Sequence, residues 1–332
     1  MNLPHAIRIL LWPLSIVYAG AMRLRASFYA RGWIKQRRLH GSVISIGNLT
    51  VGGTGKTPMV IWLAERFLSE GKRVAVLSRG YRGSAKTSDE IEVIKNRLLG
   101  RVLFGVGKDR YIEGKRLESA GVDIFLLDDG FQHLRLARNL DIVLIDSTRP
   151  LHQQWILPAG PLREPCSALH RADLVLFTRT EQSTPVVPAI QKFPQMPIYP
   201  STTKLIGFRE HGSAALLQSS CPNPVFAFAG IGNPDAFFAN LERWSVRVIG
   251  RKSFRDHHRY TRRDIQELTA AARGLNAKVL MTTEKDAQNL EPGLLSELPV
   301  HIAVVSMEIP DEERFMRDLR ERLALSSSGV AA

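Results

Sequence analysis

A glycine-rich stretch between Gly47 and Pro58 constrains the fold of this chain more than any other feature. It reads GNLTVGGTGKTP, follows an apolar strand-like run and precedes an amphipathic helix-like run. Turns of this kind bind phosphate, because glycines let backbone N–H groups approach phosphate oxygens and the helix N-terminus adds a favourable dipole. The sequence therefore predicts a phosphate-binding loop at a strand-to-helix junction.

The residue types in this loop fit a nucleotide. Lys56 offers a positive charge to the phosphates, and the Thr57 hydroxyl is placed to bind Mg²⁺. Thr50 stands where the strict motif has its first glycine, so the loop is a variant and a ligand-free glycine turn is the alternative. We expect ATP contacts from Gly52, Gly53, Thr54, Gly55, Lys56 and Thr57.

Two adjacent carboxylates, Asp128 and Asp129, directly follow the apolar run 125–127. A nucleotide-binding loop needs an acidic residue at the end of a neighbouring strand to hold the metal ion, directly or through water. We therefore predict that both residues lie on the metal side of the site. The alternative is that they cap the turn after the strand.

Apolar strand-like runs alternate with amphipathic helical runs from residue 42 onwards, which predicts an α/β fold. We expect a P-loop NTPase-like, doubly wound, mostly parallel sheet with a second, smaller α/β domain. The first domain has expected strands at 42–46, 73–77, 123–127, 141–145 and 173–177, and an expected helix at 58–68.

A stretch rich in Pro, Thr and Gln, residues 180–200, reads as a connection to the second domain. There we expect strands at 225–229, 246–249, 278–281 and 301–305, with helices at 235–243 and 262–274. The predicted domains are an N-terminal membrane-docking segment at 1–40, a P-loop nucleotide-binding domain at 41–205 and the smaller α/β domain at 206–332.

The charge and the hydrophobicity of the chain indicate that it binds to an anionic surface. Lys and Arg outnumber Asp and Glu by 45 to 32, which gives a net charge of +13 and implies an anionic partner. The apolar run 9–22 contains Pro13 and is shorter than the roughly 20 residues that cross a bilayer, so we expect it to lie in the interface. Basic residues follow it directly: Arg23, Arg25, Arg31, Lys35, Arg37 and Arg38.

Other interpretations of these features remain. The N-terminal run has the pattern of a buried helix packed on its own domain, and of a secretory signal. A basic nucleic-acid-binding module predicts basic runs with interleaved aromatic residues or a helix-turn-helix, and neither pattern is found, so no nucleic-acid partner is expected. Cys166 and Cys221 lack the spacing of a zinc site or a disulfide framework.

Several motifs together resemble the tetraacyldisaccharide 4'-kinase family, the lipid A 4'-kinases of Gram-negative bacteria. The resemblance rests on residues 46–48 and 52–58, Ser-Arg-Gly-Tyr at 78–81, Asp-Asp-Gly-Phe-Gln-His at 128–133, 158–165, Asp-His-His at 256–258 and Thr-Thr-Glu-Lys-Asp at 282–286. The start of the chain, from Leu11 to Arg25, is similar to the membrane-docking segment of that family.

The resemblance implies transfer of the ATP γ-phosphoryl group to the 4'-hydroxyl of a tetraacyldisaccharide 1-phosphate, a lipid A precursor. It also implies Mg²⁺ as a cofactor and a peripheral or monotopic position on the cytoplasmic face of the inner membrane. Both substrates are anionic, which suits the positive net charge. The alternative function is a membrane-docked P-loop NTPase acting as a regulatory switch, although the sequence lacks an Asn-Lys-x-Asp guanine motif.

The resemblance also implies catalytic residues. Asp89 matches the family's base and His257 the histidine that orients this base or tunes its pKa. Because His257 belongs to the smaller domain, we expect that domain to close over the substrates. The flanks of Asp89 differ from the family pattern, because Ser88 stands for Gly and Ile91 for Pro. A helix cap is the alternative role for Asp89, and His258 is the alternative to its neighbour.

Four further residues are predicted near the acceptor and one near the metal. Glu164 matches a family carboxylate close to the metal ion. Arginine presents a fork that suits phosphate oxygens, although most arginines are simply solvated. The expected contacts to the acceptor phosphate or sugar are Arg79, Tyr81, Arg110 and Arg163.

Overall fold

The computed structural model describes residues 4–80, 88–184, 196–217, 224–290 and 297–328. The chain divides into two units, the first comprising Met1–Thr87, Arg97–Thr202 and Glu308–Ala332, and the second Ser88–Asn96 and Thr203–Met307. This division departs from the predicted domains in two places. A short segment within 41–205 joins the second unit, and the C-terminal residues return to the first, which the order of elements along the chain does not reveal.

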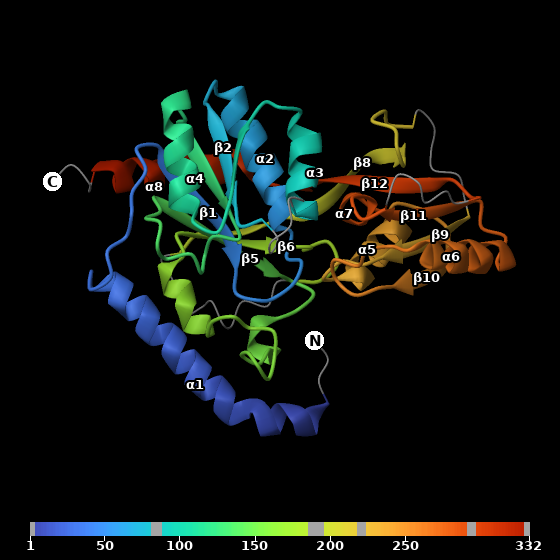
Figure 1. Cartoon of the computed structure of the whole chain (residues 1–332), viewed down its shortest axis with the longest axis horizontal. Coiled ribbons are helices and arrows are strands. Elements are labelled where there is room, and N and C mark those ends of the chain that lie inside the picture. The colour runs from blue at the N-terminus through green and yellow to red at the C-terminus, as the bar shows by residue number, and fades with distance from the viewer. Residues whose placement is uncertain (1–3, 81–87, 185–195, 218–223, 291–296, 329–332) are drawn as a thin grey trace. The chain divides into compact units, whose positions relative to one another are not determined.

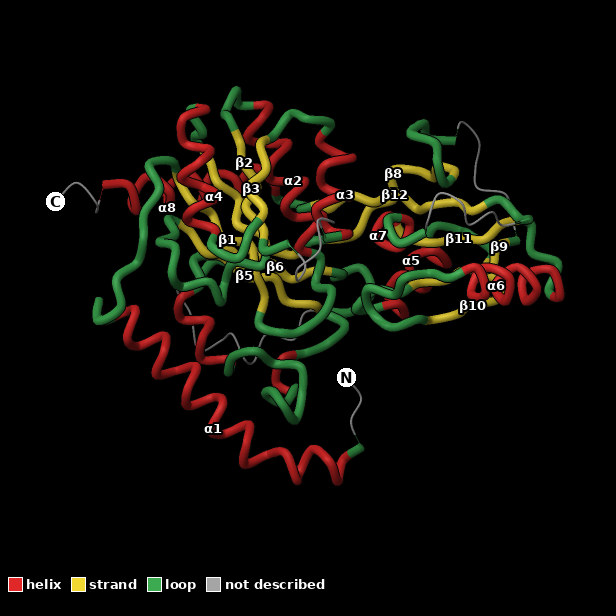
Figure 2. Tube along the Cα trace, viewed as in Figure 1, coloured by secondary structure: helices red, strands yellow, loops and turns green. Residues whose placement is uncertain are grey.

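The first unit contains a seven-stranded sheet in the order β3-β2-β4-β1-β5-β6-β7 (Figures 1 and 2). All six pairings between neighbouring strands are parallel. The strands are β1 (Ser42–Asn48), β2 (Val74–Ser78), β3 (Leu103–Val106), β4 (Ile124–Asp128), β5 (Leu140–Asp146), β6 (Leu174–Thr178) and β7 (Ile198–Pro200). Because most of these strands are buried along their whole length, they are apolar at successive positions rather than at alternate ones.

Helices cover this sheet (Figure 2). They are α2 (Lys56–Ser69), α4 (Arg110–Leu117) and α8 (Glu312–Ser328), with short 3-10 turns at Glu118–Ala120, Leu151–Gln153 and Cys166–Arg171. Helix α4 covers part of one face of the sheet, where its Tyr111 and Leu117 pack with Leu77 and Phe125 of the strands. The C-terminal helix packs on the same unit, where Arg66 of α2 forms an ion pair with Glu312.

The N-terminal helix α1 (His5–Ala30) extends along the first unit (Figure 1). Only Ser15 and Ala19 of this helix are buried. The Ser15 hydroxyl donates to the Ile156 carbonyl at 3.0 Å and accepts from the Ala159 N–H at 3.2 Å, and Arg25 donates to the Gln132 carbonyl. The helix is longer than the predicted apolar run and is long and apolar enough to cross a membrane by length and composition.

The second unit contains a five-stranded sheet in the order β10-β9-β11-β12-β8. Its strands are β8 (Thr202–Glu210), β9 (Val225–Ala229), β10 (Val248–Ser253), β11 (Val279–Thr283) and β12 (Val300–Glu308), and its helices are α5 (Pro234–Arg243), α6 (Arg262–Gly274) and the short α7 (Glu284–Ala287). Helix α3 (Asp89–Leu98) begins in this unit and ends in the first.

Strand β9 shows how the second unit is covered on both faces. Val225, Ala227 and Ala229 pack with Phe237 and Phe238 of α5. The intervening Phe226 and Phe228 pack with Ile265 and Leu268 of α6. Because side chains alternate across a strand, one helix closes each face of the sheet.

The predicted fold class is confirmed by these two sheets, and each strand predicted from the sequence corresponds to an observed one. Three observed strands were missed: β3, β7 and β8. The first two have four and three residues, too few for a clear pattern. Strand β7 lies at the end of 180–200, so the prediction of a connection was wrong at its last three residues. Residues 185–195 lie outside the described part of the chain.

Candidate active site

The phosphate-binding loop lies between the central strand β1, which ends at Asn48, and helix α2, which begins at Lys56. Its backbone requires glycine at two positions, because φ is +121° at Gly52 and +88° at Gly55. Gly55 directly precedes the first turn of α2, so the loop delivers the chain into a helix N-terminus. The local geometry is therefore that of a phosphate-binding turn.

Neighbouring segments hold this loop in place. The Thr178 hydroxyl, at the end of β6, donates to the Thr54 carbonyl at 3.1 Å, and Arg179 donates to the Gly53 carbonyl at 3.0 Å. On the other side, the Val51 N–H donates to the Pro161 carbonyl at 2.7 Å. The proline-bounded segment 158–165 thus supports the phosphate-binding loop through its backbone.

Lys56 and Arg163 flank Asp129. The Lys56 ammonium lies 3.4 Å from one Asp129 oxygen, and Arg163 donates to the other oxygen at 2.7 Å. Burial alone would raise the pKa of the Asp129 carboxyl, but Lys56 and Arg163 lower it to about 2. Asp129 is therefore a carboxylate throughout the pH range in which proteins work.

The oxygen ligands available here suit magnesium. Asp128 ends strand β4 directly beside Ile46 of β1, and Asp129 follows it. The buried Thr54 hydroxyl has no hydrogen-bond partner among the described residues. One buried Asp129 oxygen likewise has none there beyond its ion pair with the Lys56 ammonium at 3.4 Å. Hydroxyl and carboxylate oxygens are the ligands that Mg²⁺ prefers, so these residues and Thr57 fit the predicted metal.

Two predicted residues of the 158–165 segment are engaged with protein partners. Both oxygens of the buried Glu164 accept hydrogen bonds from Arg171, at 2.8 and 3.1 Å. Arg163 donates to Asp129, as described above, and lies 3.4 Å from the Gln132 side-chain oxygen. The metal-binding role of Glu164 and the acceptor-binding role of Arg163 stay predictions.

Basic side chains gather around Arg110, the first residue of α4. Its side chain is buried, its Nη1 atom lies 3.5 Å from His133 Nδ1, and its Nε atom has no hydrogen-bond partner among the described residues. Burial and the nearby Arg79 lower the pKa of Arg110, and burial, Arg110 and Arg138 lower the pKa of His133 to about 4. Crowded, desolvated positive charge of this kind favours binding of an anion.

The other predicted acceptor contacts are less well defined. Arg79 directly follows β2 and is exposed. Tyr81 lies outside the described residues. Both roles stay predictions.

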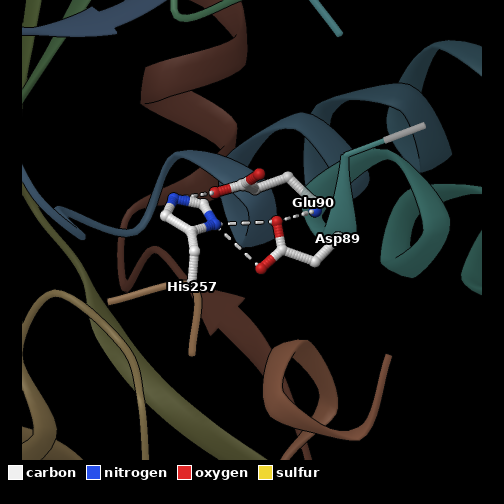
Figure 3. Close-up of side chains that lie close together, drawn as sticks. All are labelled: Asp89, Glu90 and His257. Carbon is white, nitrogen blue, oxygen red and sulfur yellow. Dashed lines mark hydrogen bonds and ion pairs between the residues drawn. The ribbon is translucent and has the colours of Figure 1, made fainter. Parts of the chain in front are cut away.

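The second unit brings together Asp89 and His257, as Figure 3 shows. His257 Nδ1 lies 3.0 and 2.9 Å from the two Asp89 carboxylate oxygens. Asp89 is the first residue of α3 and is almost fully buried, and its second oxygen also accepts from Asn289 at 3.2 Å. The pair has the geometry of a carboxylate base with an orienting histidine.

The backbone of His257 has a left-handed conformation, with φ of +60°. Its N–H donates to the Gly230 carbonyl at 3.0 Å, which helps to hold this conformation. Non-glycine residues rarely adopt it, and such residues cluster at functional sites. The adjacent His258 instead bonds Asp264 at 3.1 Å and stacks on Phe254, so the structure favours His257 as the partner of Asp89.

The groups around this pair shift the pKa values of both residues. Burial alone would raise the pKa of Asp89, but hydrogen bonds with His257 and Glu90 and the Lys285 ammonium lower it below its ordinary value. The hydrogen bond with Asp89 raises the pKa of His257, while burial and Lys285 oppose that shift. Asp89 is therefore ionised.

Asp89, Glu90 and His257 could each direct one ligand atom at a metal ion, since these atoms lie within 4.8 Å of one another. A cation is already present in the protein, because the Lys285 ammonium lies 2.9 Å from Glu90 and 3.4 Å from His257. This lysine balances part of the local negative charge. The arrangement thus fits a base with its orienting histidine better than a metal centre.

Several residues of these clusters were not predicted. Asn48 accepts from Lys56 at 3.3 Å, Arg179 supports the phosphate-binding loop, and Asn289 and Lys285 contact the Asp89–His257 pair. Asn48 and Lys285 lie inside motifs that the sequence already singled out. No local pattern signals Arg179 or Asn289, because their contacts join distant parts of the chain.

Known proteins similar to this chain match it along nearly its whole length. The family model described as tetraacyldisaccharide-1-P 4'-kinase matches residues 7–324. The tetraacyldisaccharide 4'-kinase of Geobacter metallireducens is 42% identical over 330 residues, which cover 93% of this chain and 96% of that protein. The enzyme of the same name from Desulfotalea psychrophila is 36% identical, with 88% and 90% covered.

One solved structure has a similar fold. It is LpxK from Aquifex aeolicus in complex with ATP, which superposes with a TM-score of 0.73 at 28% sequence identity. The similarity covers 96% of this chain and 99% of that one.

Proposed function

The chain belongs to the tetraacyldisaccharide-1-P 4'-kinase family, and from this premise we propose how its own residues carry out the reaction of that family. The protein is a kinase that transfers the γ-phosphoryl group of ATP to the 4'-hydroxyl of a tetraacyldisaccharide 1-phosphate in lipid A biosynthesis. The match over residues 7–324 carries this conclusion. A regulatory switch is not favoured, because the relatives of similar length are kinases.

The phosphate-binding loop holds the donor. Backbone N–H groups of 52–57 bind the ATP phosphates, and Lys56 neutralises part of their charge. Thr57, Asp128 and Asp129 would hold Mg²⁺, which supplies further charge neutralisation on phosphate oxygens when bound. The Asp129 oxygen that faces Lys56, and the nearby Thr54 hydroxyl, which has no hydrogen-bond partner among the described residues, support this assignment.

The Asp89–His257 pair serves the acceptor. The 4'-oxygen forms a bond to the γ-phosphorus while the bond from that phosphorus to the ADP oxygen breaks. The hydroxyl proton passes to an Asp89 carboxylate oxygen, which His257 orients through its Nδ1 atom. Because Asp89 keeps a lowered pKa, it is ionised before each transfer.

The acceptor is anionic, and the basic cluster of the first unit suits an anion. Arg110 is buried with an unpartnered Nε atom, and the nearby Arg79 adds positive charge. We assign these two arginines to the phosphate or sugar of the acceptor. Arg163 and Tyr81 complete the proposed set of residues that contact the acceptor. We also propose that the smaller domain closes over the bound substrates.

Helix α1 brings the protein to its lipid substrate. Large apolar side chains are exposed along it: Ile9, Leu10, Trp12, Leu14, Ile16, Val17 and Leu24. Basic residues follow within the helix and after it, as expected of a segment on anionic lipid. Since ATP is a cytoplasmic substrate, we propose that α1 docks the enzyme on the cytoplasmic face of the inner membrane.

The activity can be tested directly. Purified protein is incubated with γ-labelled ATP, Mg²⁺ and a tetraacylated disaccharide 1-phosphate in mixed micelles, and the lipid product is separated. We expect label in a bisphosphorylated lipid. Label released only as inorganic phosphate, at the same rate with and without the lipid, would show a nucleotide hydrolase instead.

A further inference from the structure

The Thr-Thr-Glu-Lys-Asp motif at 282–286 has no role in the reaction described so far, yet its side chains organise the second unit. Asp286 is fully buried and accepts hydrogen bonds from the Gly230 N–H, the Tyr260 hydroxyl and the Thr283 hydroxyl, each at 2.8 Å. Because the Gly230 carbonyl accepts from the His257 N–H, Asp286 fixes helix α7 against the backbone that carries His257.

Lys285 extends from this fixed turn to the far side of the His257 ring. Its ammonium lies 3.4 Å from His257 Nε2, 3.0 Å from Asp256 and 2.9 Å from Glu90. It also lies 4.0 Å from one Asp89 oxygen. Three donor hydrogens thus meet three acceptor groups, which is the full capacity of an ammonium group.

The chemistry of these groups determines the tautomer of His257. A lysine ammonium can only donate, so a hydrogen bond between it and His257 Nε2, which are 3.4 Å apart, requires the lone pair on Nε2. A neutral imidazole then carries its proton on Nδ1, the atom that faces the Asp89 carboxylate. A doubly protonated ring would direct an N–H at a positive charge, which is unfavourable.

The charges that face His257 from the surrounding elements act in opposite directions on its protonation. Asp89 and Glu90 belong to α3, Asp256 to the loop of His257 itself, and Lys285 to α7. Three carboxylates favour protonation of the ring, and Lys285 is the positive charge that opposes it. Glu90, Asp256 and Asp89 outweigh the effect of burial and raise the pKa of Lys285, so it remains an ammonium.

We propose that Lys285 is a positioning residue for phosphoryl transfer, which holds His257 as the neutral, Nδ1-protonated tautomer that orients the Asp89 carboxylate toward the acceptor hydroxyl. This inference rests on the proposed function of the Asp89–His257 pair. During transfer the acceptor proton moves to Asp89, while His257 keeps its Nδ1 proton and Lys285 keeps all three of its own. Lys285 therefore acts through His257 and exchanges no proton with the substrates.

The first test is a pH profile of kcat/KM for lipid phosphorylation by the full chain. Lys285→Met leaves the carboxylates unopposed, so His257 protonates at higher pH and the acidic limb moves upward. We expect a loss on the order of tenfold near neutral pH that shrinks at alkaline pH. Lys285→Arg retains the charge, so we expect the acidic limb of the pH profile to return to its wild-type position. Lys252→Met, which removes a surface ion pair with Glu267, serves as the control.

The second test is independent of activity. Nitrogen-15 spectra of the histidine rings, assigned with a His257→Gln variant, report which ring nitrogen carries the proton. In the wild-type protein we expect a protonated Nδ1 and an unprotonated Nε2, and in Lys285→Met a doubly protonated ring over a wider pH range. A wild-type ring protonated on Nε2, or an activity loss that is equal at every pH, would overturn the proposal.

These outcomes separate the inference from the function on which it rests. If the wild-type protein does not phosphorylate the lipid, the proposed function fails, while the nitrogen-15 spectra still decide the tautomer. If the wild-type protein is active and Lys285→Met matches it in both rate and spectra, only the role of Lys285 fails.

Discussion

His257 Nδ1 lies 2.9 Å from an Asp89 oxygen although the two residues are separated by 168 positions in the sequence. The contact forms within one unit, because Ser88–Asn96 leaves the first unit and packs with Thr203–Met307. Asp89 thus begins a helix whose first part belongs to the unit of its histidine partner. The proposed base and its orienting group therefore belong to one unit, which suits proton transfer.

The pH dependence of activity and that of stability should have opposite signs at His257. Its pKa is raised above the ordinary value of 6.5, mainly by the hydrogen bond with Asp89. A neutral ring is needed for transfer, so kcat/KM falls as pH drops through the raised pKa. The stability that the charged ring gains from Asp89 is present below the unfolded-state pKa and is lost as pH rises through the folded-state pKa.

The predicted pH dependence of stability can be checked with a His257→Gln variant. Unfolding of the second unit is followed by hydrogen exchange of the β9 and β11 amides, for wild type and variant, between about pH 5.5 and pH 8.5. We expect the stability difference in favour of the wild type to shrink as pH rises. A difference that grows with pH would contradict the assigned direction.

Gly47 should not tolerate a side chain. A Cβ atom there would lie 2.5 Å from the Cβ of Phe131 and 2.8 Å from its backbone nitrogen. Because Phe131 is fully buried two residues after Asp129, the strain would displace the metal-side carboxylates. We expect Gly47→Ala to destabilise the protein by about 1–3 kcal/mol and to weaken Mg-ATP binding.

The matched control for this change is Gly20→Ala in α1, where a Cβ would meet nothing within 4 Å. Thermal melting and ATP titration compare the two variants. Equal melting temperatures for both would argue against the close packing of Gly47 on Phe131.

Replacement of Arg110 should weaken binding of the lipid acceptor and leave binding of ATP unchanged. Its removal takes away a buried positive charge whose Nε atom has no partner among the described residues. We expect Arg110→Ala to raise the KM for the lipid by about tenfold or more, with Arg110→Lys only a partial rescue, because lysine lacks the guanidinium fork. Arg101→Ala, which loses a surface ion pair with Glu65 and a hydrogen bond to the Leu98 carbonyl, should behave as wild type.

Steady-state kinetics with each substrate varied in turn provide this test. A change in KM for ATP with an unchanged KM for the lipid would place Arg110 on the donor side instead.

The elements built from local patterns were predictable from the sequence. The phosphate-binding loop follows from its glycines and Lys56 at a strand-to-helix junction, and the buried strands β4 and β6 follow from the unbroken apolar runs 124–127 and 174–177. Apart from the buried Phe208, strand β8 holds exposed and half-buried residues and carries Lys204 and Arg209, so its pattern is not that of a central buried strand. The fold class could be predicted from the glycine-rich loop and the buried apolar strands alone.

The chemical role of the Thr-Thr-Glu-Lys-Asp motif could not be predicted in this way. Lys285 meets His257 from 28 positions away and Asp89 from a different segment of the chain. Hydrophobic periodicity reports which face of an element is buried, and it carries no information about such distant polar contacts. The return of α8 to the first unit was missed for the same reason.

The most direct test of the account compares Lys56→Ala and Asp89→Asn in a single-turnover assay of labelled γ-phosphoryl transfer to the lipid, alongside calorimetric titration with Mg-ATP. The account predicts that Lys56→Ala loses both ATP affinity and transfer. Asp89→Asn should bind ATP as the wild type does, yet transfer about 10²–10⁴-fold more slowly. Transfer by Asp89→Asn at the wild-type rate, or an equal loss of ATP affinity in both variants, would contradict the assignment of the donor to the phosphate-binding loop and the acceptor to Asp89.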